Sequence, residues 1–506
     1  MSQFDQTATI AFLSETATFG TMAAVETIET HISRIFLAGD RVFKMKRAVK
    51  LPYVDFSTPE RRLAACRKEV ELNSMTAPDL YLGVRCITRE ADGRLALDGD
   101  GELVDAVVEM LRFEQSALLD HMAEAGALTP DLMTRTALMI ARFHRQVPVV
   151  DTGSGAANLK GVLDINKAGF ATSHLFSDTE VWALDAAFRK ALVRHGNVLN
   201  QRQLAGKVRR CHGDLHLRNI CLLGDEPCLF DCIEFNDGIA TVDVLYDLAF
   251  LLMDLWHRGF PELANLVANR YLDETDNEDG FALLSFLMAI RAAVRAHVTG
   301  TQVEEDGDSS GNLRAEARAY FDLAADLLNE RPAQLIAIGG LSGSGKTTVA
   351  EALAAHVGAA PGARIIESDR IRKAMHGVPP ETRLPEKAYR PEVSERVYRD
   401  MAQRSSFILA EGGSVVADAV FERQLDRMRI ERAAGDRQAP FLGIWLDVAP
   451  DVLWHRVDQR RGGPSDATVE ILSHQLEKDV GELSWQRLVA ARRLDAIISD
   501  IMALCV

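Results

Sequence analysis

The sequence predicts two domains, the second of which is an α/β domain with a parallel sheet. At 506 residues, the chain is long enough for two or three domains, each with its own core. The polar, Gly/Ser-rich segment 303–311 predicts a mobile loop, and a helix expected at 314–328 ends before Arg331-Pro332. An apolar run, a glycine-rich loop and a helical pattern then follow one another over 335–353. We therefore expect domains at 1–330 and 331–506.

Residues 340–347 have the spacing G-x-x-x-x-G-K-T, between an apolar strand and a helix. In this context the backbone N–H groups of the loop wrap a triphosphate, the lysine reaches the outer phosphates and the threonine holds Mg²⁺. An ordinary glycine-rich turn is the alternative, and the strand–loop–helix context disfavours it. We therefore expect ATP and Mg²⁺ here, with Lys346 also acting in catalysis. The residues expected to contact the nucleotide are Gly340, Ser342, Gly343, Ser344, Gly345, Lys346, Thr347 and Thr348.

Two further apolar runs of the second domain end in an acid. The run 364–369 ends at Asp369, which could orient or deprotonate an acceptor hydroxyl, or cap the helix that follows it. The run 414–418 ends at Asp418, which suits the aspartate that supports Mg²⁺ in P-loop enzymes. Because ligands gather at the carboxyl ends of parallel strands, both acids are expected at the nucleotide site. Residues 441–446 predict another buried strand.

Arginines and a Gly/Pro-rich turn follow that strand. Arg456, Arg460 and Arg461 precede Gly462-Gly463-Pro464, which predicts a closing lid whose guanidinium groups bind phosphoryl oxygens. A solvated basic helix end is the alternative. Residues 485–506 predict an amphipathic helix. Over roughly 333–480 the sequence resembles the AAA-type small kinases related to gluconate kinase, chloramphenicol phosphotransferase and the kinase domain of polynucleotide kinase.

A second phosphotransfer pattern lies upstream, at His212-Gly213-Asp214 and Asn219. In protein kinases an aspartate at this spacing orients the acceptor hydroxyl, and the asparagine binds Mg²⁺. Two short apolar strands around the turn 224–227 predict a hairpin that returns Asp231 to Asn219, where a second metal ligand is needed. The alternative, a metal pair of His212 and His216 on a helix, is disfavoured by Gly213 and the flanking strands.

This segment resembles the aminoglycoside phosphotransferase family, whose loop runs H-G-D-x-x-x-x-N. Residues 231–234 are similar to the metal-binding D-x-x-E of that family, and 243–249 to its following structural motif. The resemblance spans roughly 25–300. It implies an α+β, bilobal, protein-kinase-like fold, with an N-lobe at about 1–110 and a C-lobe at about 111–330, that phosphorylates small hydroxylated molecules.

The family also requires a strand lysine and a helix glutamate to grip the ATP phosphates. Residues 41–46 alternate like a strand, on which we choose Lys44, although Lys46 faces the same side and competes with it. Glu69 matches the helix glutamate, in a helix that begins at Thr58-Pro59. Solvated side chains are the alternative for each. No G-x-G-x-x-G loop precedes Lys44, so phosphate cover must come from elsewhere, such as the turn 30–33.

Composition is that of a globular protein, with 47% hydrophobic and 26% charged residues. No apolar run approaches the ~18 residues needed to cross a membrane, and the first residues show no secretory signal, so we expect a cytoplasmic protein with no membrane partner. Seven cysteines fit a reducing compartment. Those at 211, 221, 228 and 232 are expected to pack in the core rather than to bind zinc.

The net charge of −16 is unevenly divided, with −1 from Pro332 onward and therefore −15 before it. An acidic first domain and a near-neutral second one make nucleic acid an unexpected partner. The oligomeric state stays open.

The whole arrangement resembles bacterial fusions of an aminoglycoside phosphotransferase-like domain with a P-loop kinase. We therefore predict a bifunctional ATP-dependent kinase with two Mg-ATP sites, which transfers the γ-phosphate to hydroxyl groups of a sugar-like or aminoglycoside-like small molecule. One alternative is that one domain is catalytic and the other a regulatory nucleotide-binding module. Another is that the P-loop domain is a polynucleotide 5′-kinase.

Overall fold

The structure is a computed structural model that describes residues 5–30, 32–51, 54–172, 174–306, 311–459 and 465–505. The chain divides into two compact units, one formed by residues 1–165 with 194–254 and the other by 166–193 with 255–506. The boundary expected after residue 330 falls within the second unit, between α12 (Asn312–Leu327) and β13 (Leu335–Gly339).

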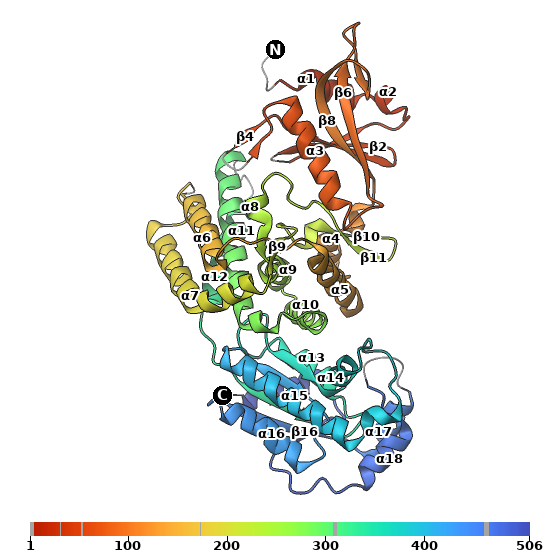
Figure 1. The fold of residues 1–506 in the computed structure, drawn as a ribbon, viewed down its shortest axis with the longest axis vertical. Helices are drawn as coiled ribbons and strands as arrows, with labels where there is room; N and C mark the ends of the chain where they lie inside the picture. Colours follow the sequence, from red (N-terminus) through yellow and green to blue (C-terminus); the bar gives the residue numbers. More distant parts are fainter. Residues whose placement is uncertain are drawn as a thin grey trace. The chain divides into compact units, whose positions relative to one another are not determined.

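The first unit opens with an antiparallel sheet of strand order β1-β2-β3-β8-β6-β7 (Figure 1). The strands are β1 (Glu26–Glu29), β2 (Ser33–Ala38), β3 (Arg41–Lys46), β6 (Tyr81–Arg89), β7 (Leu95–Leu97) and β8 (Glu102–Leu111). Leu13 of α1 (Thr7–Ser14) packs with Phe36 and Phe43 on one face, where α2 (Thr16–Phe19) follows. Cys66 of α3 (Pro59–Asn73) packs with residues of β6 and β8 on the other. A small pair, β4 (Lys50–Leu51) and β5 (Val54–Asp55), precedes α3.

Helix α3 begins as its sequence predicts. The Thr58 side chain accepts a hydrogen bond from the Arg61 N–H, and Pro59 occupies the first helical position, where its missing N–H costs nothing. Leu63, Cys66 and Val70 face the sheet core. The same helix places Glu69 entirely inside the protein, where it needs a cationic partner.

The rest of the first unit is mostly helical and also contains the predicted hairpin. The helices are η1 (Gln115–Ala117), α4 (Leu119–Glu124), α5 (Pro130–Gln146), η2 (Leu217–Asn219) and α8 (Asp237–Ala240). Helices α6 (Gly155–Phe170), α7 (Asp178–Leu204) and α9 (Val244–His257) have residues in both units. β10 (Ile220–Leu223) and β11 (Glu226–Leu229) form the hairpin, and β9 (Val208–Arg210) pairs with β12 (Thr241–Asp243).

Helices also begin the continuous part of the second unit. They are α10 (Pro261–Glu274), η3 (Glu278–Leu283), α11 (Leu284–Asp306) and α12. The mobile loop expected at 303–311 is wrong in its first part, because α11 continues to Asp306; residues 307–310 lie outside the described residues. Among the described residues one stretch, 278–304, is apolar and long enough to cross a membrane, contrary to expectation. It is a buried core helix by its surroundings, since 72% of its apolar window is covered by protein.

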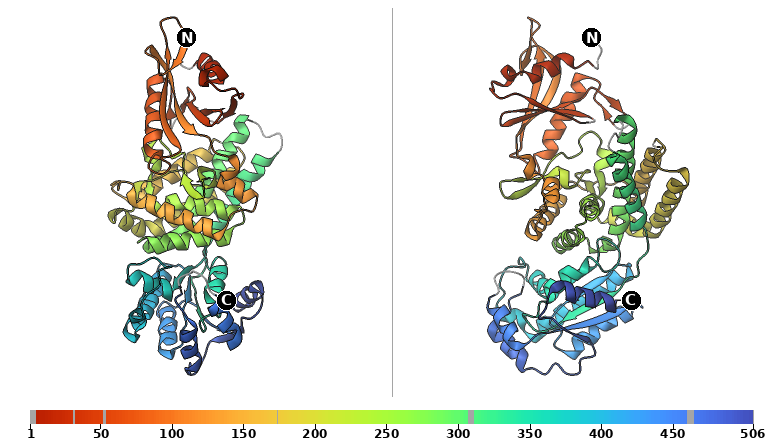
Figure 2. Two further views of the ribbon diagram at one scale, coloured as in Figure 1. Left: turned by 90° about the vertical axis from the view of Figure 1, so that its right-hand side faces the viewer. Right: turned by 180° about the vertical axis from the view of Figure 1, so that it is seen from behind.

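The parallel sheet of the second unit has the strand order β14-β15-β13-β16-β17. Its other strands are β14 (Arg364–Glu367), β15 (Val415–Asp418), β16 (Phe441–Asp447) and β17 (Gln486–Val489). Helices α15 (Pro391–Ala410) and α16 (Gln424–Gly435) cover one face, and α13 (Lys346–Ala354) and α19 (Leu494–Leu504) the other (Figures 1 and 2). α14 (Ser368–Met375), η4 (Glu386–Tyr389), α17 (Pro450–Asp458) and α18 (Val469–Glu477) complete the unit.

The single helix expected at 485–506 is wrong for its first residues. Residues 486–489 form the edge strand β17, which pairs in parallel with β16, and only 494–504 are helical. The physical reason lies in Trp485, whose ring fills the space above Gly443 of β16 and fixes the chain against that strand.

Candidate active sites

In the first unit, the loop 212–219 places its two predicted catalytic side chains in contact. The Asn219 amide donates hydrogen bonds to the Asp214 carboxylate at 2.9 Å and to the Asp214 backbone carbonyl at 2.8 Å. The hairpin that follows Asn219 returns the chain, so that the Phe230 N–H donates to the Asn219 carbonyl at 3.1 Å. Asp231 therefore follows directly beside Asn219, and its φ of +61° turns it out of the strand direction.

Two buried carboxylates of α9 accept hydrogen bonds from the backbone of this loop. Asp247 accepts hydrogen bonds from the N–H groups of His212 at 3.1 Å and Gly213 at 2.8 Å, and Asp254 accepts one from Leu217 at 3.0 Å. Gly213 has a φ of +87°, which favours glycine over other residues. His212 is buried in a loop and its Nε2 lies 2.9 Å from the Phe230 carbonyl, so the alternative of a histidine metal pair on a helix is wrong.

The predicted strand lysine and helix glutamate also meet. The Lys44 ammonium lies 2.8 Å from Glu69 Oε1 and contacts the Asp231 carboxylate. Lys46 lies 2.5 Å from Glu69 Oε2, and its second contact is Glu234 rather than Asp231. Only Lys44 thus reaches the predicted metal ligand. The Glu234 carboxylate is buried and paired with Lys46. It is therefore not available for the metal-binding role that the resemblance to D-x-x-E implies.

These buried charges shift one another's pKa. Burial opposes the charge on Lys44, but Asp231 and Glu69 outweigh it and raise the pKa of Lys44 well above its usual value. Burial likewise raises the pKa of Glu69, but Lys44 and Lys46 outweigh that effect and lower it to about 2. Both groups are therefore charged at neutral pH, as a phosphate grip requires.

In the second unit, the loop between β13 and α13 has the shape of a phosphate cradle. A Cβ at Gly343 would lie 3.0 Å from the Leu453 carbonyl, and the φ values of Gly343 and Gly345 are +86° and +90°. The Ser344 hydroxyl is buried and has no hydrogen-bond partner among the described residues. The Ser342 N–H donates to the Gln475 side chain at 3.0 Å. A bound phosphate fits this loop, because it would supply an acceptor for the Ser344 hydroxyl.

A cavity of about 600 Å³ opens in front of the loop. It is lined by Lys346, Thr347 and Thr348 and by both predicted acids, Asp369 and Asp418. The Thr347 hydroxyl donates to Asp418 at 2.6 Å, and these hard oxygen donors suit Mg²⁺. Burial raises the pKa of Asp418 to about 7, against the opposing effect of Lys346.

Asp369 lies in the first turn of α14 and is not its N-cap, which is Glu367. The capping alternative is therefore wrong, because the helix begins at Ser368, before Asp369. Burial raises the pKa of Asp369, while Arg372 and Lys346 oppose the shift. A cavity-lining carboxylate of raised pKa is suited to accept a proton.

The predicted lid is described only in part. Arg456 of α17 donates to the Gly343 carbonyl at 3.3 Å, so it reaches the phosphate loop. Arg460 and Arg461 lie outside the described residues, as does the turn 462–464. The turn 30–33, expected to cover phosphate in the first site, connects β1 to β2, and His31 also lies outside.

A protein-family model matches a segment in each of the two predicted domains. Residues 94–287 match the phosphotransferase enzyme family, and residues 335–478 match the AAA domain family. The chain joins a phosphotransferase-family domain to an AAA domain. The chain is therefore a phosphotransferase enzyme, with the predicted protein-kinase-like and P-loop folds.

Individual proteins are also similar to this chain or to parts of it. Uncharacterized proteins from Mycobacterium tuberculosis and Mycobacterium bovis are 28% identical over 456 residues, which cover 88% of this chain and 88% of theirs. A gluconokinase from Sinorhizobium meliloti is 25% identical and covers 35% of this chain and 92% of its own, with a TM-score of 0.24. A choline/ethanolamine kinase family protein from Mesorhizobium loti is 15% identical and covers 61% and 90%, with a TM-score of 0.39.

Among the cavity residues of the AAA domain that the sequence did not predict, Arg372 is a buried cation. Arg372 is buried, stacks on the Tyr389 ring at 4.7 Å and donates to the Ala388 carbonyl at 2.8 Å, while its Nε has no partner among the described residues. Its spacing of three residues from Asp369 on α14 was the available signal, because residues at this spacing share a helix face.

Proposed function

We propose that the chain is a bifunctional, cytoplasmic, ATP- and Mg²⁺-dependent kinase, whose two sites transfer the γ-phosphate of ATP to hydroxyl groups of small sugar-like or aminoglycoside-like molecules. The observation that carries this proposal is that each site gathers a separate set of phosphotransfer groups. Asp214, Asn219 and Asp231 meet Lys44 in the first site. The phosphate loop meets Asp369 and Asp418 in the second.

In the first site, Asp214 would orient the acceptor hydroxyl and accept its proton as the oxygen attacks. Lys44, held by Glu69 at 2.8 Å, would bind the ATP phosphates. Asn219 and Asp231 would hold Mg²⁺, which neutralises charge on the phosphate oxygens when bound. The Asn219 amide bonded to Asp214 couples the position of the metal ligand to that of the base.

In the second site, the loop amides and Lys346 would bind the β- and γ-phosphates, and Thr347 with Asp418 would hold Mg²⁺. Asp369 would accept the proton of the acceptor hydroxyl. Arg456, together with Arg460 and Arg461 of the predicted lid, would offset charge that develops on the transferred group. Arg372, which lines the same cavity as Asp369, would contact the acceptor.

Turnover by variants of the intact chain tests the proposal. ADP release is measured with sugars, polyols, aminoglycosides and nucleosides for wild type, Asp214→Asn and Lys346→Ala. Two active sites predict that each variant loses activity toward a part of the acceptor set and keeps the rest. If Lys346→Ala abolishes turnover with every acceptor, the first site is not an active kinase and the regulatory alternative replaces the proposal.

The polynucleotide alternative is tested separately. Binding of labelled oligonucleotides at two salt concentrations would reveal a phosphate-binding groove through a steep salt dependence. We expect no such binding, because the residues from Pro332 onward have a net charge of only −1 and no excess of basic residues.

A further inference from the structure

Helix α10 belongs to the segment before the AAA match, yet it is bonded to the edge of the AAA parallel sheet. The Asn269 side chain accepts from the Ile365 N–H at 2.8 Å and donates to the Ala363 carbonyl at 3.2 Å. Asn265 donates to the carbonyls of Pro361 and Ala363 at 2.9 and 3.0 Å. These amides satisfy backbone groups at the start of β14 and in the residues just before it, so α10 is fixed against that edge of the sheet.

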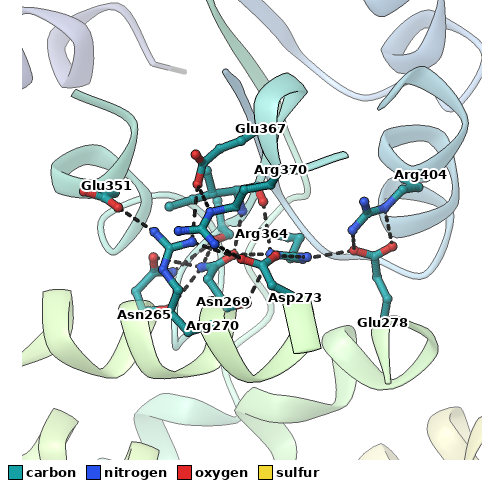
Figure 3. A network of polar contacts seen from close by, with 12 residues as sticks. Asn265, Asn269, Arg270, Asp273, Glu278, Glu351, Arg364, Glu367, Arg370 and Arg404 are labelled. Atoms are coloured by element: carbon teal, nitrogen blue, oxygen red, sulfur yellow. Dashed lines mark hydrogen bonds and ion pairs between the residues drawn. The ribbon is translucent and has the colours of Figure 1, made fainter. Parts of the chain in front are cut away.

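A network of four arginines and four carboxylates extends from this contact (Figure 3). Its members are Arg270, Asp273, Glu278, Glu351, Arg364, Glu367, Arg370 and Arg404. The formal charges cancel, which lowers the cost of burying them. Burial raises the pKa of Asp273, but Arg364, Arg370 and Arg270 outweigh it and hold that pKa below its usual value. The carboxylate therefore stays ionised and paired.

Within this network Arg270 makes two contacts that lead to the nucleotide cavity. Its guanidinium lies 2.6 Å from Glu351 of α13, the helix that begins with the phosphate-loop residues Lys346 and Thr347. It also lies 3.3 Å from Glu367, the last residue of β14, which lines the cavity. Figure 3 shows both carboxylates turned toward the same guanidinium.

Arg270 joins α13, which carries phosphate-binding residues, to the end of β14, which leads to the proposed base Asp369. Glu351 follows Thr347 by one helical turn, and Glu367 precedes Asp369 by two residues and pairs in the sheet with Asp418. A displacement between α13 and the end of β14 would therefore move the phosphate-binding groups relative to the base. Misplacement of about 1 Å costs up to ~100-fold in rate.

We propose that Arg270 is a positioning residue of the second site, contributed by α10 from outside the AAA segment. It clamps α13 to the end of β14 and so fixes Lys346 and Thr347 relative to Asp369. This inference rests on the proposed kinase activity of that site.

The test uses the full chain carrying Asp214→Asn, so that ADP release reports the second site. Arg270→Met and Arg270→Lys are compared with Arg404→Met, the matched control. Arg404 bonds Glu278 at 2.6 and 2.8 Å, joining the same two segments without lining the cavity. kcat, KM for ATP and the thermal midpoint are measured for each.

We expect Arg270→Met to lower kcat about 10- to 100-fold, with KM for ATP within about threefold. Arg270→Lys should recover part of kcat, and Arg404→Met should lower the thermal midpoint similarly while leaving kcat within about threefold. Equal kcat losses in Arg270→Met and Arg404→Met, or an unchanged kcat in Arg270→Met, would overturn the inference alone. No ADP release by the Asp214→Asn parent with any acceptor would instead overturn the proposed function of the site, and this inference with it.

Discussion

Replacing Lys44 and Lys46 separately with methionine distinguishes two lysines that the sequence cannot tell apart. Both contact Glu69, but only Lys44 contacts Asp231, and only Lys46 contacts the buried Glu234. Lys44 is therefore placed to bind phosphate, whereas Lys46 neutralises buried acids. Methionine keeps the chain length and removes the charge in each case.

The expected magnitudes follow from what each change leaves behind. Lys46→Met leaves Glu234, 5% exposed, without its cation, and breaking such a buried pair costs about 3–5 kcal/mol. At about 2–4 °C per kcal/mol for a domain of this size, the midpoint falls by roughly 6–20 °C. Lys44→Met leaves Glu69 paired with Lys46 at 2.5 Å and leaves Asp231 with its side chain 42% exposed to water. Its stability cost should stay below about 2 kcal/mol.

The loss of first-site activity should show the opposite order, larger for Lys44→Met than for Lys46→Met. Lys44→Met is expected to lower kcat/KM for ATP at the first site at least ~100-fold, about 2.7 kcal/mol of transition-state binding. The assay is ADP release in a Lys346→Ala background, with thermal denaturation of the same samples. A folded, inactive Lys46→Met beside an active Lys44→Met would refute the assignment of the two lysines.

Three other predictions concern charge. The pKa of Glu69 falls from 4.5 to about 2 on folding, so its charge adds stability that is complete above pH 4.5 and is lost as the pH falls toward 2. The urea concentration at the unfolding midpoint should therefore depend less on pH, between pH 5 and 3, in Glu69→Gln than in the wild type. The pKa of Asp418 is raised to about 7, so this carboxylate is protonated below that pH. The Mg²⁺ affinity of the second site, measured by calorimetry, should therefore fall about tenfold for each pH unit below 7. The affinity of Asp418→Asn should not show this fall. Arg372→Met should raise KM for the second-site acceptor about tenfold or more and leave first-site KM unchanged, as steady-state kinetics would show. A constant urea difference, an unchanged Mg²⁺ affinity at pH 6 or an unchanged KM would contradict them in turn.

Local sequence was enough to predict the elements whose chemistry is local. The phosphate loop, the β10–β11 hairpin and the start of α3 depend on glycines, turn residues and a Thr-Pro cap within a few positions. The strand β3 follows from alternation alone. Asp214, Asn219 and Asp231 come together because a hairpin of fixed length returns the chain.

Other features depend on contacts between distant segments and left weaker signals. Lys44 differs from Lys46 only through Asp231 and Glu234, which lie far along the sequence. The short strand β17 has three exposed residues of four and is fixed by pairing with β16. Arg270 resembles any surface arginine of an amphipathic helix until β14 is placed beside it.

The stoichiometry of nucleotide binding tests the central claim most directly. Titration calorimetry of the intact chain with a non-hydrolysable ATP analogue and Mg²⁺ should give two sites per chain. Lys346→Ala should retain only the first site, and Lys44→Met only the second. A single site per chain, lost entirely in one of these variants and unaffected in the other, would contradict an enzyme with two phosphotransfer centres.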